Sequence, residues 1–92
     1  MSDLHIEQAH ERELEDVRGI VRGLTGQLRD SYSIQSTWTD DDTVSFSRSG
    51  LSGTLRIDEK RVVVDMKLGM MARAFKGKIK SELSRQMANH LG

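Results

Sequence analysis

The chain has 92 residues, enough for one small domain, and carries 14 basic and 14 acidic side chains. Balanced charge argues against a general nucleic-acid binder, and the absence of cysteine excludes disulfides and thiolate chemistry. The sequence shows neither an apolar run long enough for a transmembrane segment nor the apolar core of a signal peptide, so a cytoplasmic location is expected.

The first part of the chain predicts a strand, a helix and a second strand. Leu4 to Glu7 alternates apolar and polar residues, as a short strand with one buried face does. From about Glu11 the apolar residues follow the helical period and form one stripe. The stripe consists of Leu14, Val17, Ile20, Val21, Leu24 and Leu28. After Ser31 the alternation returns and predicts a strand over residues 34–39, with Asp40, Asp41 and Asp42 in the following turn.

Three glycines interrupt this helix on the side opposite its apolar stripe. They are Gly19, Gly23 and Gly26, and each costs a helix about 1 kcal/mol relative to alanine. A tolerated, weak helix is the favoured interpretation, and close contact with a partner is the alternative.

Three further strands are predicted over residues 44–47, 51–57 and 62–68, and their apolar residues share one parity. Gly50 is expected to take a positive φ in the turn between the first two. Gly53 lies in mid-strand and predicts a bulge or the close approach of a helix. Val63 is expected to point to the other face of the sheet.

After Gly69 the sequence predicts a long basic helix. Its apolar stripe consists of Ala72, Phe75, Ile79, Leu83, Met87 and Leu91. Its far face would carry Met70, Ala74, Gly77, Ser81 and Ala88. These mostly small residues would let another helix approach closely, although a face exposed to solvent is the slightly favoured interpretation.

Together these elements predict one α+β domain over residues 1–92. A short N-terminal strand, a helix, a four-stranded antiparallel meander and a long C-terminal helix follow in that order, with both helices on one sheet face. The N-terminal strand would join the sheet edge through the helix crossover, as in a miniature helix-grip fold. Because so short a domain buries only about two-thirds of its unfolded surface, we expect a homodimer.

No set of residues predicts catalysis, a cofactor or a metal site. His5, His10 and His90 show no ligand spacing and are interpreted as surface histidines. The acids at 40–42 lack the spaced ligands and the glycine of a calcium loop. No serine lies in a nucleophile elbow, so the chain is not expected to be an enzyme.

The start of the last helix is the predicted contact surface. Met70 and Met71 could supply apolar contacts, framed by the cations Arg73, Lys76 and Lys80. In the competing interpretation, Met71 and Phe75 close the end of the core.

Several segments resemble the small bacterial polyhydroxyalkanoic acid system family. They are Leu4-His5-Ile6 with His10, the hairpin from Phe46 to Gly53, Lys67-Leu68-Gly69-Met70-Met71, and Phe75-Lys76 with Ile79. The most specific are R-S-G-x-x-G, here Arg48 to Gly53, and K-L-G before the last helix. The sequence departs from the family at Met70-Met71, where phenylalanine or leucine is more usual, and in the glycines of the first helix.

The resemblance implies a non-enzymatic accessory protein of polyhydroxyalkanoate synthesis or storage. Such a protein would bind a storage granule or a granule protein. The resemblance implies no catalytic residues. The alternative is a small domain that binds an apolar acyl ligand between the sheet and the last helix. A core filled by Trp38, Phe46 and Phe75 would leave little room for that ligand, so granule binding is favoured.

Overall fold

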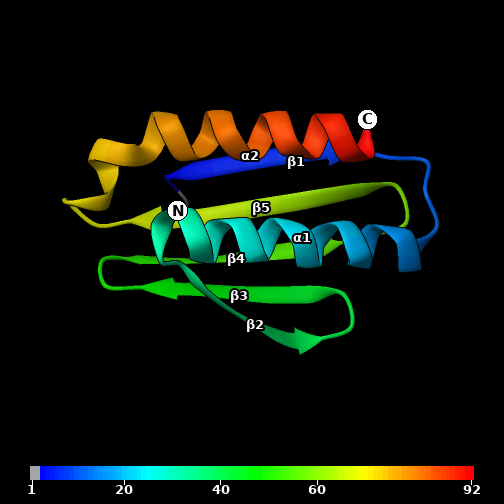
Figure 1. Ribbon diagram of the computed structural model, residues 1–92, viewed down its shortest axis with the longest axis horizontal. Coiled ribbons are helices and arrows are strands. Elements are labelled where there is room, and N and C mark those ends of the chain that lie inside the picture. Colours follow the sequence, from blue (N-terminus) through cyan, green and yellow to red (C-terminus); the bar gives the residue numbers. More distant parts are fainter. Residues whose placement is uncertain (1–2) are drawn as a thin grey trace.

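The computed structural model describes residues 3–92 as an antiparallel sheet of five strands covered by two helices (Figure 1). The strands are β1 (Leu4–Ala9), β2 (Gln35–Asp40), β3 (Thr43–Arg48), β4 (Leu51–Ile57) and β5 (Arg61–Leu68). The helices are α1 (Leu14–Tyr32) and α2 (Lys76–Leu91), and a short 3-10 helix, η1 (Ala72–Phe75), leads into α2. The predicted α+β class with a long C-terminal helix is confirmed.

The strands lie in the order β1-β5-β4-β3-β2, and every neighbouring pair is antiparallel. β2 to β5 form the predicted meander. β1 pairs with β5, with Leu4 opposite Met66 and Ile6 opposite Val64. Since β1 and β2 occupy the two edges of the sheet, the connection through α1 passes from one edge to the other, and α1 itself lies along the strands over the sheet face (Figure 1).

One face of the sheet carries the apolar core. The buried strand residues are Leu4, Ile6, Val44, Phe46, Leu51, Leu55, Ile57, Val62, Val64, Met66 and Leu68. Both helical stripes join the same cluster, for example through Val21 of α1 and Leu83 of α2. The two helices therefore lie side by side on one sheet face, as predicted (Figure 1).

Gly53 permits a close contact between β4 and β5. A Cβ atom at this position would lie 2.6 Å from the Asp65 carbonyl oxygen and 2.8 Å from Cγ of Met66. Pairing is regular through Gly53 on both sides. The predicted bulge is therefore wrong, and the close approach comes from β5 rather than from a helix. A register shift occurs instead between Trp38 and Asp40 on β2.

Trp38 lies at the margin of the core, not within it as expected. Its half-buried ring packs against the core from the edge strand β2. The Arg22 guanidinium lies 5.6 Å from the ring centroid, a cation–π arrangement that covers part of the ring. An edge strand has no further neighbour to bury such a ring completely.

The ends of α1 are set by backbone contacts. The helix begins at Leu14 rather than near Glu11. It ends with Ser33 in the left-handed conformation at φ 57°. The N–H of Ser33 donates to the Arg29 carbonyl oxygen at 3.0 Å, and the N–H of Ile34 donates to that of Leu28 at 3.3 Å. This pattern satisfies carbonyl groups at the helix end and turns the chain into β2.

The last helix differs from the prediction at its beginning. Met70 and Met71 form a turn, η1 follows, and α-helical geometry begins only at Lys76. A 3-10 segment has three residues per turn, so Phe75 does not continue the stripe of α2 and is 52% exposed. Periodicity in the sequence cannot distinguish so short a 3-10 segment from one turn of α-helix.

The second sheet face is mostly polar and faces solvent. Val63 lies on it, as predicted, and is half-buried. Nearby, His5 Nδ1 lies 2.6 Å from Asp65 Oδ1, and His5 Nε2 lies 3.4 Å from Glu7 Oε1. The hydrogen bond to Asp65, reinforced by the charges of both carboxylates, raises the pKa of His5 above its usual 6.5.

Replacing Ser33 with Gly should raise the free energy of unfolding by about 0.5–1 kcal/mol. A left-handed conformation costs a residue with a Cβ atom about 1–2 kcal/mol, and the greater freedom of glycine in the unfolded chain offsets part of the gain. Urea denaturation measures the change. The matched control is Ser31→Gly, an exposed position inside α1, which should lower stability by roughly 0.5 kcal/mol. Equal destabilisation by both changes would contradict the strain at Ser33.

The contribution of His5 to the free energy of unfolding should decrease as pH rises. Because folding raises its pKa, the contribution is fully present below the unfolded pKa of about 6.5 and is lost as pH rises through the folded value. NMR titration should give a raised pKa for His5 that falls in Asp65→Asn. The urea midpoint of His5→Gln should lack this pH-dependent component, and a wild-type midpoint that rose across this interval would contradict the assignment.

Candidate functional site

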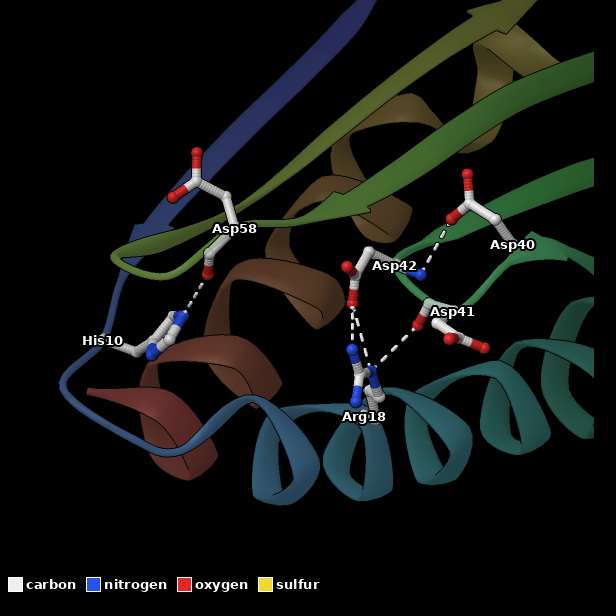
Figure 2. A network of polar contacts seen from close by, with 6 residues as sticks. All are labelled: His10, Arg18, Asp40, Asp41, Asp42 and Asp58. Atoms are coloured by element: carbon white, nitrogen blue, oxygen red, sulfur yellow. Dashed lines mark hydrogen bonds and ion pairs between the residues drawn. The ribbon is translucent and has the colours of Figure 1, made fainter.

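The two ends of the sheet differ in chemistry. Figure 2 shows polar contacts that fix the loops and turns at the end where α1 begins. Arg18 of α1 donates to Asp42 Oδ1 through Nε at 3.0 Å and Nη2 at 2.8 Å, and Nε also donates to the Asp41 carbonyl oxygen at 3.1 Å. Asp40 Oδ1 accepts from the Asp42 N–H at 2.8 Å. These contacts hold the β2–β3 turn against α1. Asp41 and Asp42 form the turn as predicted, whereas Asp40 is the last residue of β2.

His10 fixes the loop between β1 and α1 at the same end. The side chain is buried, contrary to the expectation that it lies on the surface. Nε2 donates to the Asp58 carbonyl oxygen at 2.8 Å (Figure 2), and Nδ1 accepts from the Arg12 N–H at 3.1 Å. This geometry assigns the neutral tautomer with hydrogen on Nε2. Nε2 therefore joins this loop to the β4–β5 turn, and Nδ1 accepts a hydrogen bond from within the loop itself.

The opposite end brings together the two most specific motifs of the sequence. Gly50, in the β3–β4 turn, has the predicted positive φ of 79°. Its carbonyl oxygen accepts from the N–H of Gly69 at 2.6 Å. A Cβ atom on Gly69 would lie 3.0 Å from that oxygen, so glycine lets the two segments approach. The R-S-G hairpin and the K-L-G segment are neighbours in space.

Three large hydrophobic side chains are exposed beside this contact. Met70 is 86% exposed, Met71 87% and Phe75 52%, and we call these three residues the apolar cluster. They belong to the segment between β5 and α2 that projects beyond the end of the sheet (Figure 1). The interpretation in which Met71 and Phe75 close the core is wrong, because the core ends at residues such as Leu68 and Ile79.

The predicted cations near this cluster differ in whether they have a carboxylate partner. Arg73 Nη2 lies 3.7 Å from Asp3 Oδ1, and Asp3 Oδ2 accepts from the Leu68 N–H at 2.8 Å. That backbone hydrogen bond, with the charges of Arg73 and Lys76, lowers the pKa of Asp3. Within residues 3–92, Lys76 and Lys80 have no carboxylate at ion-pair distance, and both are exposed. The charge of Arg73 is thus partly neutralised, whereas the two lysines remain available.

A cavity of about 280 Å³ lies against the apolar cluster. Its lining residues come from the end of α1, the β3–β4 hairpin, η1 and α2: Tyr32, Ile34, Arg48, Ser49, Leu51, Met71, Ala72, Phe75 and Ile79. Burial raises the pKa of Tyr32, and the nearby charge of Glu82 adds to the shift, so the phenol remains neutral. Arg48 Nη1 donates to the Tyr32 carbonyl oxygen at 2.7 Å. The cavity is mainly apolar with one cationic group in its wall.

Sequence reasoning identified the cluster but missed the cavity. Met71 and the predicted cations near it were found because they follow one another along the chain. Tyr32, Ile34 and Arg48 come from distant segments, and their meeting depends on how α1 lies on the sheet. The R-S-G hairpin was noticed as a motif, but nothing local showed which segment Arg48 would contact.

The remaining predicted groups do not converge. Across residues 3–92 no three histidine, cysteine or acidic side chains are placed to hold one metal ion. His90 lies at the end of α2, 3.2 Å from Gln86. No helix in this part of the chain is both long enough and apolar enough to cross a bilayer.

Comparison with known proteins supports the resemblance seen in the sequence. A family model described as "putative polyhydroxyalkanoic acid system protein" matches residues 4–91. A search of curated proteins gives no match. The family match extends from the first strand to the last residue of α2 and includes the apolar cluster and every residue that lines the cavity. The chain therefore belongs to the polyhydroxyalkanoic acid system family.

Proposed function

We propose that this protein is a non-enzymatic accessory protein of polyhydroxyalkanoate synthesis or storage. It would work in the bacterial cytoplasm and bind a storage granule, or a protein on its surface, through the apolar cluster. The observation that carries the proposal is the exposure of Met70, Met71 and Phe75 at one end of an otherwise well-packed fold. The name of the family links the chain to the polyhydroxyalkanoate system, which supports the proposal.

The chemistry of the cluster suits an apolar surface with an amphiphilic coat. Side chains that project beyond the core can enter such a surface without unfolding the protein. Methionine is flexible and polarisable and adapts to an irregular contact. Lys76 and Lys80 are exposed and have no carboxylate partner within residues 3–92, so each could add up to about 1 kcal/mol near an anionic coat.

The cavity beside the cluster favours a second function, the binding of an apolar acyl ligand. Ile34 and Leu51 come from the sheet side and Ile79 from α2, so a ligand would lie between the sheet and the C-terminal helix. The volume of about 280 Å³ is near the lower limit of ordinary ligand pockets. A small ligand is therefore the one that the cavity could enclose.

Granule binding predicts that the double change Met70→Ser and Met71→Ser reduces co-sedimentation with isolated granules. Thermal stability should change little, because both side chains are exposed and serine does not disturb a turn. Reversing the charge of the two exposed lysines, with Lys76→Glu and Lys80→Glu, should also reduce granule binding. The granule binding that remains should depend less on salt concentration.

The matched control for charge is Arg12→Glu with Lys60→Glu. Both side chains are exposed in loops at the opposite end of the sheet, so this protein should bind granules as the wild type does. Unchanged co-sedimentation of the methionine variant, with the fold intact, would show that the apolar cluster is not the contact surface.

We also propose a homodimer, because several small residues present open surfaces. Ala74, Gly77 and Ala88 are exposed along the last helical segment, and a Cβ atom at Gly19 or Gly23 would meet nothing within 4 Å. Light scattering after size exclusion should give twice the chain mass of 10.4 kDa. A monomer at high protein concentration would refute this proposal and leave granule binding untouched.

A further inference from the structure

We propose that the cavity binds the acyl chain of a small monocarboxylate and that Arg48 binds its carboxylate group. This inference rests on the acyl-binding function, because it names the ligand class for that site. It does not require binding to a granule. The ligand would place its apolar chain among Ile34, Leu51 and Ile79, with its charged end toward Arg48.

The walls and the size of the cavity define the chain. Aliphatic and aromatic side chains supply most of the lining, and transfer of a methylene group from water to such walls is favourable. A volume of about 280 Å³ is close to the lower limit of pockets that hold small ligands, about 300 Å³. A short acyl chain is therefore the ligand that suits this space.

Arg48 defines the head group. The side chain is exposed at the end of β3 and lines the cavity. Its Nη1 donates to the Tyr32 carbonyl oxygen, which holds the guanidinium against the end of α1. Among the described residues 3–92 no carboxylate lies at ion-pair distance from it. A guanidinium has five N–H donors, so donors remain for a carboxylate.

Arg48 also has a purely structural role that must be separated from ligand binding. A cation at the C-terminal end of a helix, bonded to a free carbonyl oxygen, stabilises that end. The contact with Tyr32 is such an interaction, and it accounts for one nitrogen of the guanidinium. This structural role does not account for the apolar cavity beside the remaining N–H donors. Carboxylate binding and helix stabilisation by Arg48 also make different predictions for the binding of a neutral ligand.

Hexanoate and its uncharged analogue hexanamide test the proposal with the full chain. Titration followed by NMR should shift the methyl signals of Ile34, Leu51 and Ile79. Arg48→Gln keeps a donor for the Tyr32 carbonyl but removes the charge, and it should weaken hexanoate binding roughly tenfold or more. Binding of hexanamide should be similar in both proteins. Arg48→Lys keeps a charge and should retain part of the hexanoate affinity.

Two further variants serve as controls. Ala72→Leu fills part of the cavity and should weaken hexanoate and hexanamide together. Arg56→Gln removes the same charge from the neighbouring strand β4, where the side chain is exposed and does not line the cavity, and it should change neither affinity. Thermal unfolding of each variant reports whether the fold is retained.

The outcomes separate this inference from the acyl-binding function. If hexanoate binds wild type and Arg48→Gln equally, with the expected methyl shifts, the role of Arg48 is refuted and acyl binding stands. If neither ligand shifts the methyl signals of the cavity residues, carboxylate recognition by Arg48 and acyl binding are both refuted. Loss of hexanoate binding in Arg48→Gln, with hexanamide unaffected, supports the recognition of a carboxylate by Arg48.

Discussion

The burial of a single sheet face under two helices is the constraint on which the rest of this structure depends. Each strand has one apolar parity, and the stripes of α1 and α2 complete one continuous core. Burial of each aliphatic side chain contributes about 1.5–3 kcal/mol. Because side chains of both helices belong to this one cluster, the same burial holds both helices on the sheet. The other sheet face is left to polar side chains such as His5 and Asp65.

This arrangement makes the two ends of the sheet different. At one end, Arg18 fixes the β2–β3 turn to α1 and His10 fixes the β1–α1 loop to the β4–β5 turn (Figure 2). At the other end, the backbone contact between Gly50 and Gly69 joins the hairpin to the segment before α2. Met70 and Met71, which follow Gly69 directly, are exposed. The cavity lies beside this contact and is lined by Met71 from one segment and Arg48 and Ser49 from the other.

The proposed granule contact and the proposed ligand site share Met71 and Phe75. The side chains that we propose for granule contact thus include two that line the cavity. The cations near them differ in whether they have a partner. Arg73 is paired with Asp3 and Arg48 with the end of α1, whereas Lys76 and Lys80 are unpaired within residues 3–92. The positive charges near the apolar end therefore differ in their contacts: Arg48 and Arg73 have partners within the protein, and the proposals assign a surface role to the two lysines.

Local periodicity in the sequence was enough to predict the strands, the stripe of α1, the stripe of α2 from Ile79 onward, the antiparallel meander and the placement of the helices on one face. Alternation along β5 and the spacing from Val17 to Leu28 each report which side of an element must be buried, and that information lies within a few residues. The positive φ of Gly50 followed in the same way from its place in a tight turn. The family resemblance was likewise carried by short local motifs.

Tertiary structure alone decided the rest. The 3-10 start of the last helical segment, the exposure of Phe75 and the burial of His10 depend on contacts between segments far apart in the chain. The cavity requires Tyr32, Arg48 and Ile79 to meet, and no periodicity encodes that meeting. The spacing of apolar residues specifies which face of a helix or strand is buried. How the buried face of one element lies against that of another is fixed only when the whole core packs.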